Sequence, residues 1–294
     1  MGFAPVNAVC IIIVMHLSKA KTCIFCGTPL DNNNRSKEHV IPTWLSQHLN
    51  IKGQIVTPSH QSASTGDIIS KRKHTIDKLI EGRICATCNN QWMSSIETLN
   101  QPLLIELMDS HKHLSDLKNN QRIQIARWAC KTAWLLNSSS NYIHNIPLEH
   151  FRHIYTNVDT LPSRVIVVAQ QHSATRPFCW IQGSAWPIEF GDDLSEAEVK
   201  ELSKNAYKIG LQLRDLMILI AFWPHEGWFY SMQMNLHIPL WPLCGMCGWH
   251  NGTSWHEHES EKAFYGFTTS LMIITKERLQ QCKCLTNGLH NKSI

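Results

Sequence analysis

Four cysteines stand in two Cys-x-x-Cys pairs, Cys23 with Cys26 and Cys85 with Cys88. A turn of this kind can place two thiolates on one ion at about 2.3 Å, and two such turns complete a tetrahedral zinc site. Gly27 follows the first pair, where the turn favours a backbone near positive φ. Because four sulfur ligands leave no open coordination position, the pattern predicts a structural Zn²⁺ held by all four cysteines. Two redox pairs or four unrelated buried thiols are the alternatives.

A glutamate and a histidine, Glu38 and His39, lie between the two cysteine pairs. Neighbouring side chains of a strand point to opposite faces, but at a bend or bulge both can serve one site. Histidine can take a proton from water near neutral pH, and a carboxylate is a hard ligand for a divalent cation. Asn89, directly after Cys88, can cap the helix expected there or bind a metal ion. A shared zinc ion would hold Asn89 beside the Glu38–His39 step.

Two sequence blocks contain these residues, EHVIPTWL over residues 38–45 and CATCNNQWMSSIE over residues 85–97. Together with the first cysteine pair they resemble a bacterial zinc-knuckle subgroup of the HNH endonucleases, in which EH-I-P--WL precedes C--CN--WM--IE. The resemblance covers about residues 21–100. It implies a ββα-metal (HNH, treble-clef-like) zinc module.

The resemblance also implies an activity, the metal-dependent hydrolysis of phosphodiester bonds in nucleic acid, with DNA as the expected substrate. His39 would be the general base that activates water. Glu38 and Asn89 would hold a catalytic Mg²⁺ or another divalent ion, which stabilises the charge of the phosphorane. Lys37 and Arg35 would position the phosphate. A catalytically inactive zinc-knuckle protein that only binds nucleic acid, or a purely structural zinc module, are the alternatives.

The chain departs from the family pattern at three positions. Members commonly carry an Asn before the second cysteine pair, which orients the base, but residues 74–85 contain none. Asn89 stands where many members have His, and Glu38 stands where Asp is commoner. A backbone carbonyl group, another side chain, Asn89 or Asn90 would then have to orient His39.

The elements that must position these residues indicate an α+β fold. The expected first unit, over residues 19–100, is the HNH nuclease module with its four-cysteine zinc site. Residues 101–294 are expected to follow as a helical linker and a mixed α+β domain with an antiparallel sheet. Nothing in this second part names a ligand. The role of this second domain has three alternatives: substrate recognition, homodimer formation and contact with a partner.

Hydrophobic periodicity predicts the individual elements. Apolar residues at three- and four-residue spacing predict a helix over residues 121–136, with Lys131 largely off its apolar face. Another helix is expected over residues 93–107, interrupted or restarted at Pro102. The polar residues 47–73 predict a loop. A buried hairpin is expected over residues 207–223, and strands over residues 164–170, 178–182, 228–238 and 264–275.

Composition and charge indicate a folded protein with a basic first half. Hydrophobic residues make up 43% and charged residues 17% of the chain, unlike a disordered protein. The net charge of +4 is uneven, because residues 19–131 carry 15 Lys and Arg against 9 Asp and Glu, and residues 132–294 carry 12 against 14. A phosphate backbone would favour this excess beside the candidate site, although a solvated surface with chance asymmetry also fits.

Cysteine usage and the first residues bear on location. Cys-x-x-Cys pairs in a chain of 294 residues favour metal binding in a reducing compartment, so a cytoplasmic location is expected. The apolar stretch over residues 3–17 is shorter than the roughly 20 residues that span a bilayer, so no stable membrane insertion is expected. Three interpretations of this stretch are considered: a buried edge strand or short helix, an uncleaved membrane anchor, and an over-long start with Met15 as the true initiator. A further hypothesis, a second metal site, involves Cys244, Cys247 and His250.

Overall fold

The computed structural model describes most of the chain. The described residues are 21–61, 68–139, 144–174, 176–183, 195, 197–198, 201, 203–233, 237–241, 247–250 and 260–275. Two sequence predictions lie outside them, namely the interpretations of residues 3–17 and Met15. The second metal site lies outside them as well, because it needs Cys244 and the side chains of Cys247 and His250.

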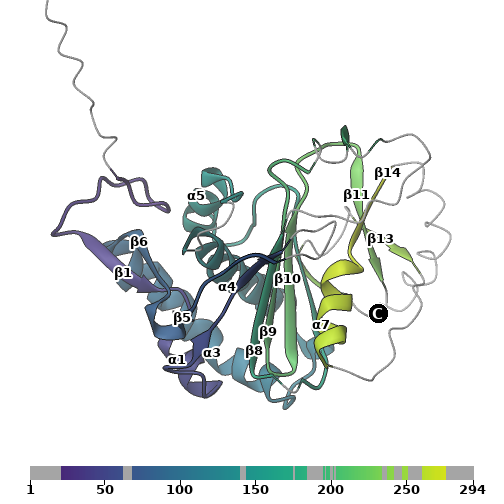
Figure 1. Ribbon diagram of the computed structural model, residues 1–294, viewed down its shortest axis with the longest axis horizontal. Helices are drawn as coiled ribbons and strands as arrows, with labels where there is room; N and C mark the ends of the chain where they lie inside the picture. Colours follow the sequence, from purple (N-terminus) through teal and green to yellow (C-terminus); the bar gives the residue numbers. More distant parts are fainter. Residues whose placement is uncertain are drawn as a thin grey trace, which may run out of the picture.

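A five-stranded antiparallel sheet lies at the centre of the molecule, with the strand order β12-β7-β10-β9-β8 (Figure 1). The hairpin predicted over residues 207–223 is confirmed, because β9 and β10 pair from Tyr207 opposite Phe222 to Leu213 opposite Leu216. Both strands are buried along their whole length, since both faces of the sheet are covered. The strands are β7 (Val165–Gln171), β8 (Phe178–Gly183), β9 (Tyr207–Leu213), β10 (Leu216–Phe222) and β12 (Ile238–Trp241).

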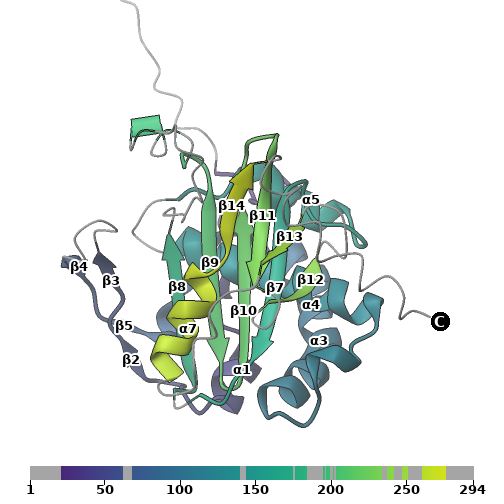
Figure 2. The ribbon, with the colours of Figure 1, turned by 90° about the vertical axis from the view of Figure 1, so that its right-hand side faces the viewer.

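Helices cover one face of this sheet, and one helix with a smaller sheet covers the other (Figure 1 and Figure 2). The helices of the first face are α3 (Ser94–Met108), α4 (Asn119–Ser139) and α5 (Leu148–Thr156). The second face carries α7 (Ser260–Thr269) and a three-stranded sheet with the order β13-β11-β14. The strands of the smaller sheet are β11 (Trp228–Gln233), β13 (Cys247–His250) and β14 (Met272–Thr275).

Strand β7 shows how the two faces use alternate residues. Val165, Val167 and Ala169 join the hydrophobic cluster on the side of α4, whereas Ile166 and Val168 join the cluster on the side of α7. Successive side chains of a strand point to opposite faces, so the run of β-branched residues serves two cores at once.

Helix α4 confirms the helix predicted over residues 121–136 and extends it at both ends. Trp128 and Trp134 are fully buried on it. Lys131 is fully buried too, paired with Glu97, so its position largely off the apolar face does not leave it exposed. The physical reason is that α4 is enclosed on two sides, by the central sheet and by the strand pair β1–β6 (Figure 1).

A strand pair of the N-terminal part lies on the far side of the helical layer from the central sheet (Figure 1). This antiparallel pair consists of β1 (Arg35–His39) and β6 (Ile80–Cys85). Strand β6 runs directly into α2 (Ala86–Cys88), then into the π-helical turn η2 (Asn89–Met93) and α3. Further short helical pieces in the described part of the chain are α1 (Thr43–His48), η1 (Ile76–Lys78) and η3 (Leu114–Asp116).

The loop predicted over residues 47–73 is wrong in part, because its second half forms a projecting ribbon (Figure 2). Isoleucine and valine favour extended backbone, which explains strands within this polar segment. The ribbon consists of two antiparallel strand pairs, β2 (Ile55–Val56) with β5 (His74–Thr75) and β3 (Ser59–Gln61) with β4 (Ile68–Lys71).

Helix α3 continues through Pro102, so the predicted interruption is wrong. A proline lacks the N–H that would bond the carbonyl group four residues earlier, here that of Thr98. Both residues are exposed, so water can hydrate that carbonyl group. Burial of Leu104 and Leu107 on the opposite side then holds the helix together.

The strand predicted over residues 264–275 is also corrected, since this segment is the end of α7 followed by β14. Phe264 and Phe267 are three residues apart and both fully buried, as on one face of a helix. Gly210 of β9 leaves room for that helix, because a Cβ atom there would lie 2.5 Å from Cγ2 of Thr268.

The predicted fold class, a mixed α+β protein with antiparallel sheets, is confirmed. The division near residue 100 stays a prediction, and one hydrophobic cluster runs from the cysteine turns to the central sheet. Among the described residues, no helix combines the length and the apolar character that a membrane crossing requires.

Candidate metal centre and active site

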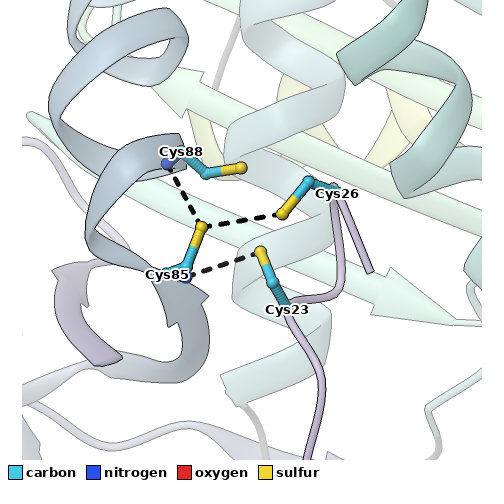
Figure 3. A group of neighbouring side chains, drawn as sticks. All are labelled: Cys23, Cys26, Cys85 and Cys88. Atoms are coloured by element: carbon cyan, nitrogen blue, oxygen red, sulfur yellow. Dashed lines mark hydrogen bonds between the residues drawn. The ribbon is translucent and has the colours of Figure 1, made fainter. Parts of the chain in front are cut away.

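The sulfur atoms of Cys23, Cys26, Cys85 and Cys88 gather at one point, all within 4.8 Å of one another (Figure 3). The sulfurs of Cys26 and Cys85 are 3.6 Å apart. Four sulfurs at about 2.3 Å from a tetrahedral ion lie about 3.8 Å from each other, so the cluster fits one metal ion of that kind. None of the four forms a disulfide. The alternative of four unrelated thiols is therefore excluded.

Local hydrogen bonds explain how the two cysteine turns form. Gly27 has a φ of +78°, as the first turn requires, and its N–H donates to the carbonyl oxygen of Cys23 over 2.9 Å. In the second turn, the N–H of Cys88 donates to Sγ of Cys85 over 3.3 Å. The two turns are joined by the N–H of Cys85, which donates to Sγ of Cys23 over 3.4 Å.

The thiol groups of the cluster share their protons unequally. A hydrogen bond from Cys88 lowers the pKa of Cys23 to about 4, and it raises the pKa of Cys88 well above its ordinary value. Burial raises the pKa of Cys85. The protein by itself thus favours the thiolate at Cys23 and the thiol at Cys85 and Cys88. A divalent cation would convert the other thiols to thiolates as it binds and release their protons.

Strand β1 carries the acid and the histidine of the first sequence block. A bulge interrupts its pairing with β6 between Ser36 and Glu38, but the pairing is regular at the Glu38–His39 step, so these two side chains lie on opposite faces of the strand and the irregularity expected at that step is not found there. After the bulge, Glu38 pairs with Glu81 and His39 with Ile80. Glu38 is half-buried and points toward the helical layer, whereas His39 is exposed. Within the described residues, the ring of His39 forms no hydrogen bond.

Asn89 lies beside Glu38, although 51 residues separate them in the sequence. Its Nδ2 donates to Oγ of Ser36 over 2.7 Å, and its side chain also hydrogen-bonds the carboxyl group of Glu38. The amide nitrogen of Asn89 is thus engaged by Ser36, and its amide oxygen is of the type that can bind a cation or water. The cysteine cluster starts the helical stretch that carries Asn89, which explains how it reaches β1.

The surroundings of Glu38 favour a cation at its carboxyl group. Burial is the main reason that the pKa of Glu38 is raised, and the nearby carboxylate of Glu97 raises it further, while Lys131 opposes both. A raised pKa means that the ionised carboxyl group is incompletely compensated by the protein. The oxygen atoms of Glu38 and Asn89 are of the type that Mg²⁺ prefers. These two residues therefore fit a divalent ion.

A buried network beneath β1 is a feature that sequence reasoning missed. Glu97 of α3 forms an ion pair with the fully buried Lys131 of α4. The indole groups of Trp44 and Trp128 both donate to Oε2 of Glu97, over 2.7 and 2.9 Å. Trp44 and Glu97 both belong to the two sequence blocks, and this is the signal that could have pointed to their contact.

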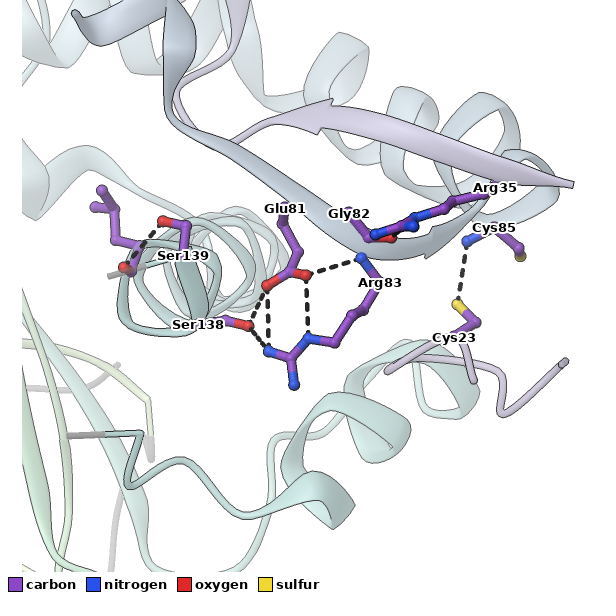
Figure 4. A network of polar contacts seen from close by, with 9 residues as sticks. Cys23, Arg35, Glu81, Gly82, Arg83, Cys85, Ser138 and Ser139 are labelled. Atoms are coloured by element: carbon purple, nitrogen blue, oxygen red, sulfur yellow. Dashed lines mark hydrogen bonds and ion pairs between the residues drawn. The ribbon is translucent and has the colours of Figure 1, made fainter. Parts of the chain in front are cut away.

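A second network joins β6 to the end of α4 (Figure 4). Glu81 is buried, accepts two hydrogen bonds from the Arg83 side chain and one from its backbone N–H, and contacts Oγ of Ser138. Burial alone would raise the pKa of Glu81, but the hydrogen bonds from Arg83 and Ser138 hold it below its ordinary value. Glu81 is thus an ionised structural group that anchors β6, the partner strand of Glu38.

The two cations expected to position a phosphate differ in their surroundings. Lys37 is exposed at the bulge of β1 and forms no ion pair within the described residues. Arg35 is exposed as well, but its Nε donates to the carbonyl oxygen of Gly82 over 2.5 Å. Its guanidinium group therefore lies along β6, and the remaining N–H groups are available to solvent.

Of the predicted residues, Glu38, His39, Asn89, Lys37 and Arg35 lie on β1 or directly beside it. Glu38 and Asn89 are in contact, and His39 follows Glu38 on the exposed side of the β1–β6 strand pair. The cysteine cluster is separate and holds no open position for a substrate. Compared with protein families, curated proteins and solved structures, the chain matches none of them.

Proposed function

We propose that the protein is a metal-dependent endonuclease of the HNH kind, which hydrolyses phosphodiester bonds in nucleic acid, with DNA as the expected substrate. The observation that carries this proposal is the contact between Glu38 and Asn89 beside the bulge that precedes the exposed His39. The order of elements supports it: a cysteine turn, two antiparallel strands, a second cysteine turn and a helix.

His39 is assigned the role of general base in this proposal. It takes a proton from a water molecule, whose oxygen then forms a bond to phosphorus while the bond to the leaving oxygen breaks. The leaving oxygen receives a proton from solvent. The exposure of His39 supports this role, because a polymer backbone must reach the base. A divalent ion, when held by Glu38 and Asn89, supplies positive charge near the phosphoryl oxygens.

The four cysteines are assigned a structural zinc ion. Sulfur ligands in tetrahedral arrangement suit Zn²⁺ better than Mg²⁺ or Ca²⁺, which prefer oxygen. With four protein ligands the ion has no open position, so it would hold β6 and the helix start together without taking part in hydrolysis. This assignment separates the two metals: zinc positions Asn89, and the oxygen-bound ion belongs to the reaction.

Plasmid cleavage tests the proposal directly. Purified protein is incubated with supercoiled plasmid and Mg²⁺ or Mn²⁺, beside an EDTA control and the His39→Ala variant. We expect divalent-dependent nicking or linearisation that His39→Ala reduces at least about 100-fold, because a general base contributes 10²–10⁴-fold. His113→Ala is the matched control, since His113 is another exposed histidine and lies outside β1. Cleavage retained in His39→Ala would contradict the assigned role.

The binding alternative makes a different prediction in the same preparation. A catalytically inactive zinc-knuckle protein would show salt-dependent DNA affinity and no cleavage with any divalent ion. A purely structural zinc module would show neither. Circular dichroism and zinc content of each variant establish that a lost activity does not come from a lost fold.

A further inference from the structure

The ribbon inserted between β1 and β6 concentrates positive charge. It comprises residues 52–61 and 68–75, and we call these residues the arm. The arm carries four cations and no Asp or Glu, namely Lys52, Lys71, Arg72 and Lys73, and Asp67 lies among the six residues between its halves. The whole chain has a net charge of only +4. Lys71, Arg72 and Lys73 are exposed and form no ion pair within the described residues. Uncompensated cations on a projecting element indicate a polyanionic partner.

The arm also exposes large apolar side chains. The exposed fractions are 68% for Ile55, 50% for Ile68 and 61% for Ile69. Ile68 and Ile69 are exposed on the same short strand as Lys71, with Ile69 at a bulge in the pairing of β4 with β3, so the arm exposes apolar and cationic groups close together. Isoleucines left in water on a ribbon that buries little of itself indicate a surface completed by a partner.

The arm begins beside the candidate active site. The N–H of Ile76 donates to the carbonyl oxygen of Gln54 over 3.0 Å and closes the base of the arm. Ile80, the partner of His39 across β1 and β6, follows Thr75 by five residues. Five residues span at most about 17 Å. The base of the arm therefore lies within about 17 Å of Ile80, the residue that pairs with His39.

The dimensions of the arm suit a nucleic-acid duplex. The arm is a two-stranded ribbon, in which the N–H of Arg72 donates to the carbonyl oxygen of Pro58 over 3.2 Å between the two strand pairs. The major groove of B-form DNA is about 12 Å wide and admits such a ribbon, whereas the major groove of A-form RNA is too narrow. The seven residues from Ile55 to Gln61 span at most about 23 Å, roughly two thirds of a helical turn.

We propose that the arm is a binding site for duplex DNA, in which Lys71, Arg72 and Lys73 contact phosphates and the isoleucines face the groove. One consequence of this inference rests on the proposed function, namely that the Glu38–His39–Asn89 site acts on double-stranded DNA. The binding site itself stands on the charge, exposure and shape of the arm.

Equilibrium binding tests the arm in the full chain. The His39→Ala protein is titrated against a labelled 20-base-pair duplex, and the additional change is Lys71→Gln with Lys73→Gln. We expect the Kd to rise at least about tenfold and the slope of log K against log salt to fall by about 1.8, because each lost phosphate contact removes about 0.9. Lys118→Gln with Lys204→Gln is the control, which removes the same charge from exposed lysines elsewhere and should change the Kd less than about twofold.

Three outcomes would overturn the inference. The first is an equal effect of the arm and control substitutions on the Kd. The second is an equal loss of affinity for single-stranded DNA or for duplex RNA. The third is a change of oligomeric state: light scattering shows a dimer, Ile69→Lys converts it to a monomer, and the affinity for duplex DNA is unchanged. The arm would then bind a second copy of the chain.

Cleavage assays separate this inference from the proposed function. A chain that cuts DNA with the same KM before and after the two arm substitutions keeps its nuclease assignment and loses the arm assignment. A chain that cuts nothing, yet binds duplex DNA through the arm, loses the nuclease assignment and keeps the arm as a binding site.

Discussion

The indole Nε1 of Trp44 donates a hydrogen bond of 2.7 Å to Oε2 of Glu97, across 53 residues of sequence. Trp44 stands in the block that carries Glu38 and His39, and Glu97 ends the block that carries Asn89. The two blocks of the candidate site are thus joined by a half-buried carboxylate. A carboxylate in this position needs a nearby cation, and Lys131 supplies it.

Replacing Glu97 should destabilise the protein. Glu97→Gln keeps the shape of the side chain but leaves the fully buried ammonium group of Lys131 without its counterion. We expect the free energy of unfolding to fall by about 3–5 kcal/mol in urea denaturation. The double change Glu97→Gln with Lys131→Met should recover part of this loss, because no buried charge remains unpaired. The control is Glu106→Gln, whose partner Lys112 is 3.9 Å away at the surface, with an expected change below about 1 kcal/mol.

Replacing Glu38 should separate stability from activity. The pKa of Glu38 is raised in the folded protein, mainly by burial, so stability falls as the pH rises from the ordinary value of 4.5 to the raised pKa, and the loss is complete above it. Glu38→Gln removes this loss at pH 7 and should raise the free energy of unfolding by about 0.5–2 kcal/mol without added divalent ion. The gain should shrink at pH 4, where Glu38 is protonated. Plasmid cleavage should fall about 100-fold or more. A variant that is both less stable and fully active would contradict the assignment.

The ion pair of Glu81 should make the fold sensitive to acid. Its pKa is lowered below the ordinary value of 4.5, so the stabilisation is complete above pH 4.5 and is lost as the pH falls through the folded value. Glu81→Gln should lower the free energy of unfolding by about 1.5–3 kcal/mol at pH 7. Urea denaturation at pH 3 should show a smaller difference. The exposed Glu149→Gln serves as the control, and an equal pH dependence in both variants would count against this account.

Zinc content should follow the four cysteines. The purified protein is expected to contain one zinc ion per chain by elemental analysis, and Cys26→Ala should lower this ratio together with the melting temperature. Structural zinc can contribute on the order of 10 kcal/mol of apparent stability, so partial unfolding is expected. Cys179→Ala, a half-buried cysteine of β8 outside the cluster, should keep the full ratio. Unchanged zinc in Cys26→Ala would rule out the four-sulfur site.

Local patterns were sufficient for several parts of the molecule. The two Cys-x-x-Cys turns meet as their spacing predicts, because each turn fixes two sulfurs within a few residues. The periodicity of α4 and the apolar run of β10 are likewise local, since a helix with an apolar face leaves a repeat in the sequence and a strand buried on both faces leaves an unbroken apolar run. The continuation of α3 through Pro102 was not predictable in this way, because it depends on which side of the helix faces water.

The sequence alone determined which residues could do chemistry: the four cysteines, and Glu38, His39 and Asn89 at motif spacing. Only the tertiary structure decided what surrounds them. It buried Lys131 against Glu97, turned the amide nitrogen of Asn89 toward Ser36, and raised the arm beside β6. These relationships join residues about 20 to 50 positions apart. A contact between such residues depends on how separate elements pack, and packing leaves no periodic trace in the sequence of either element.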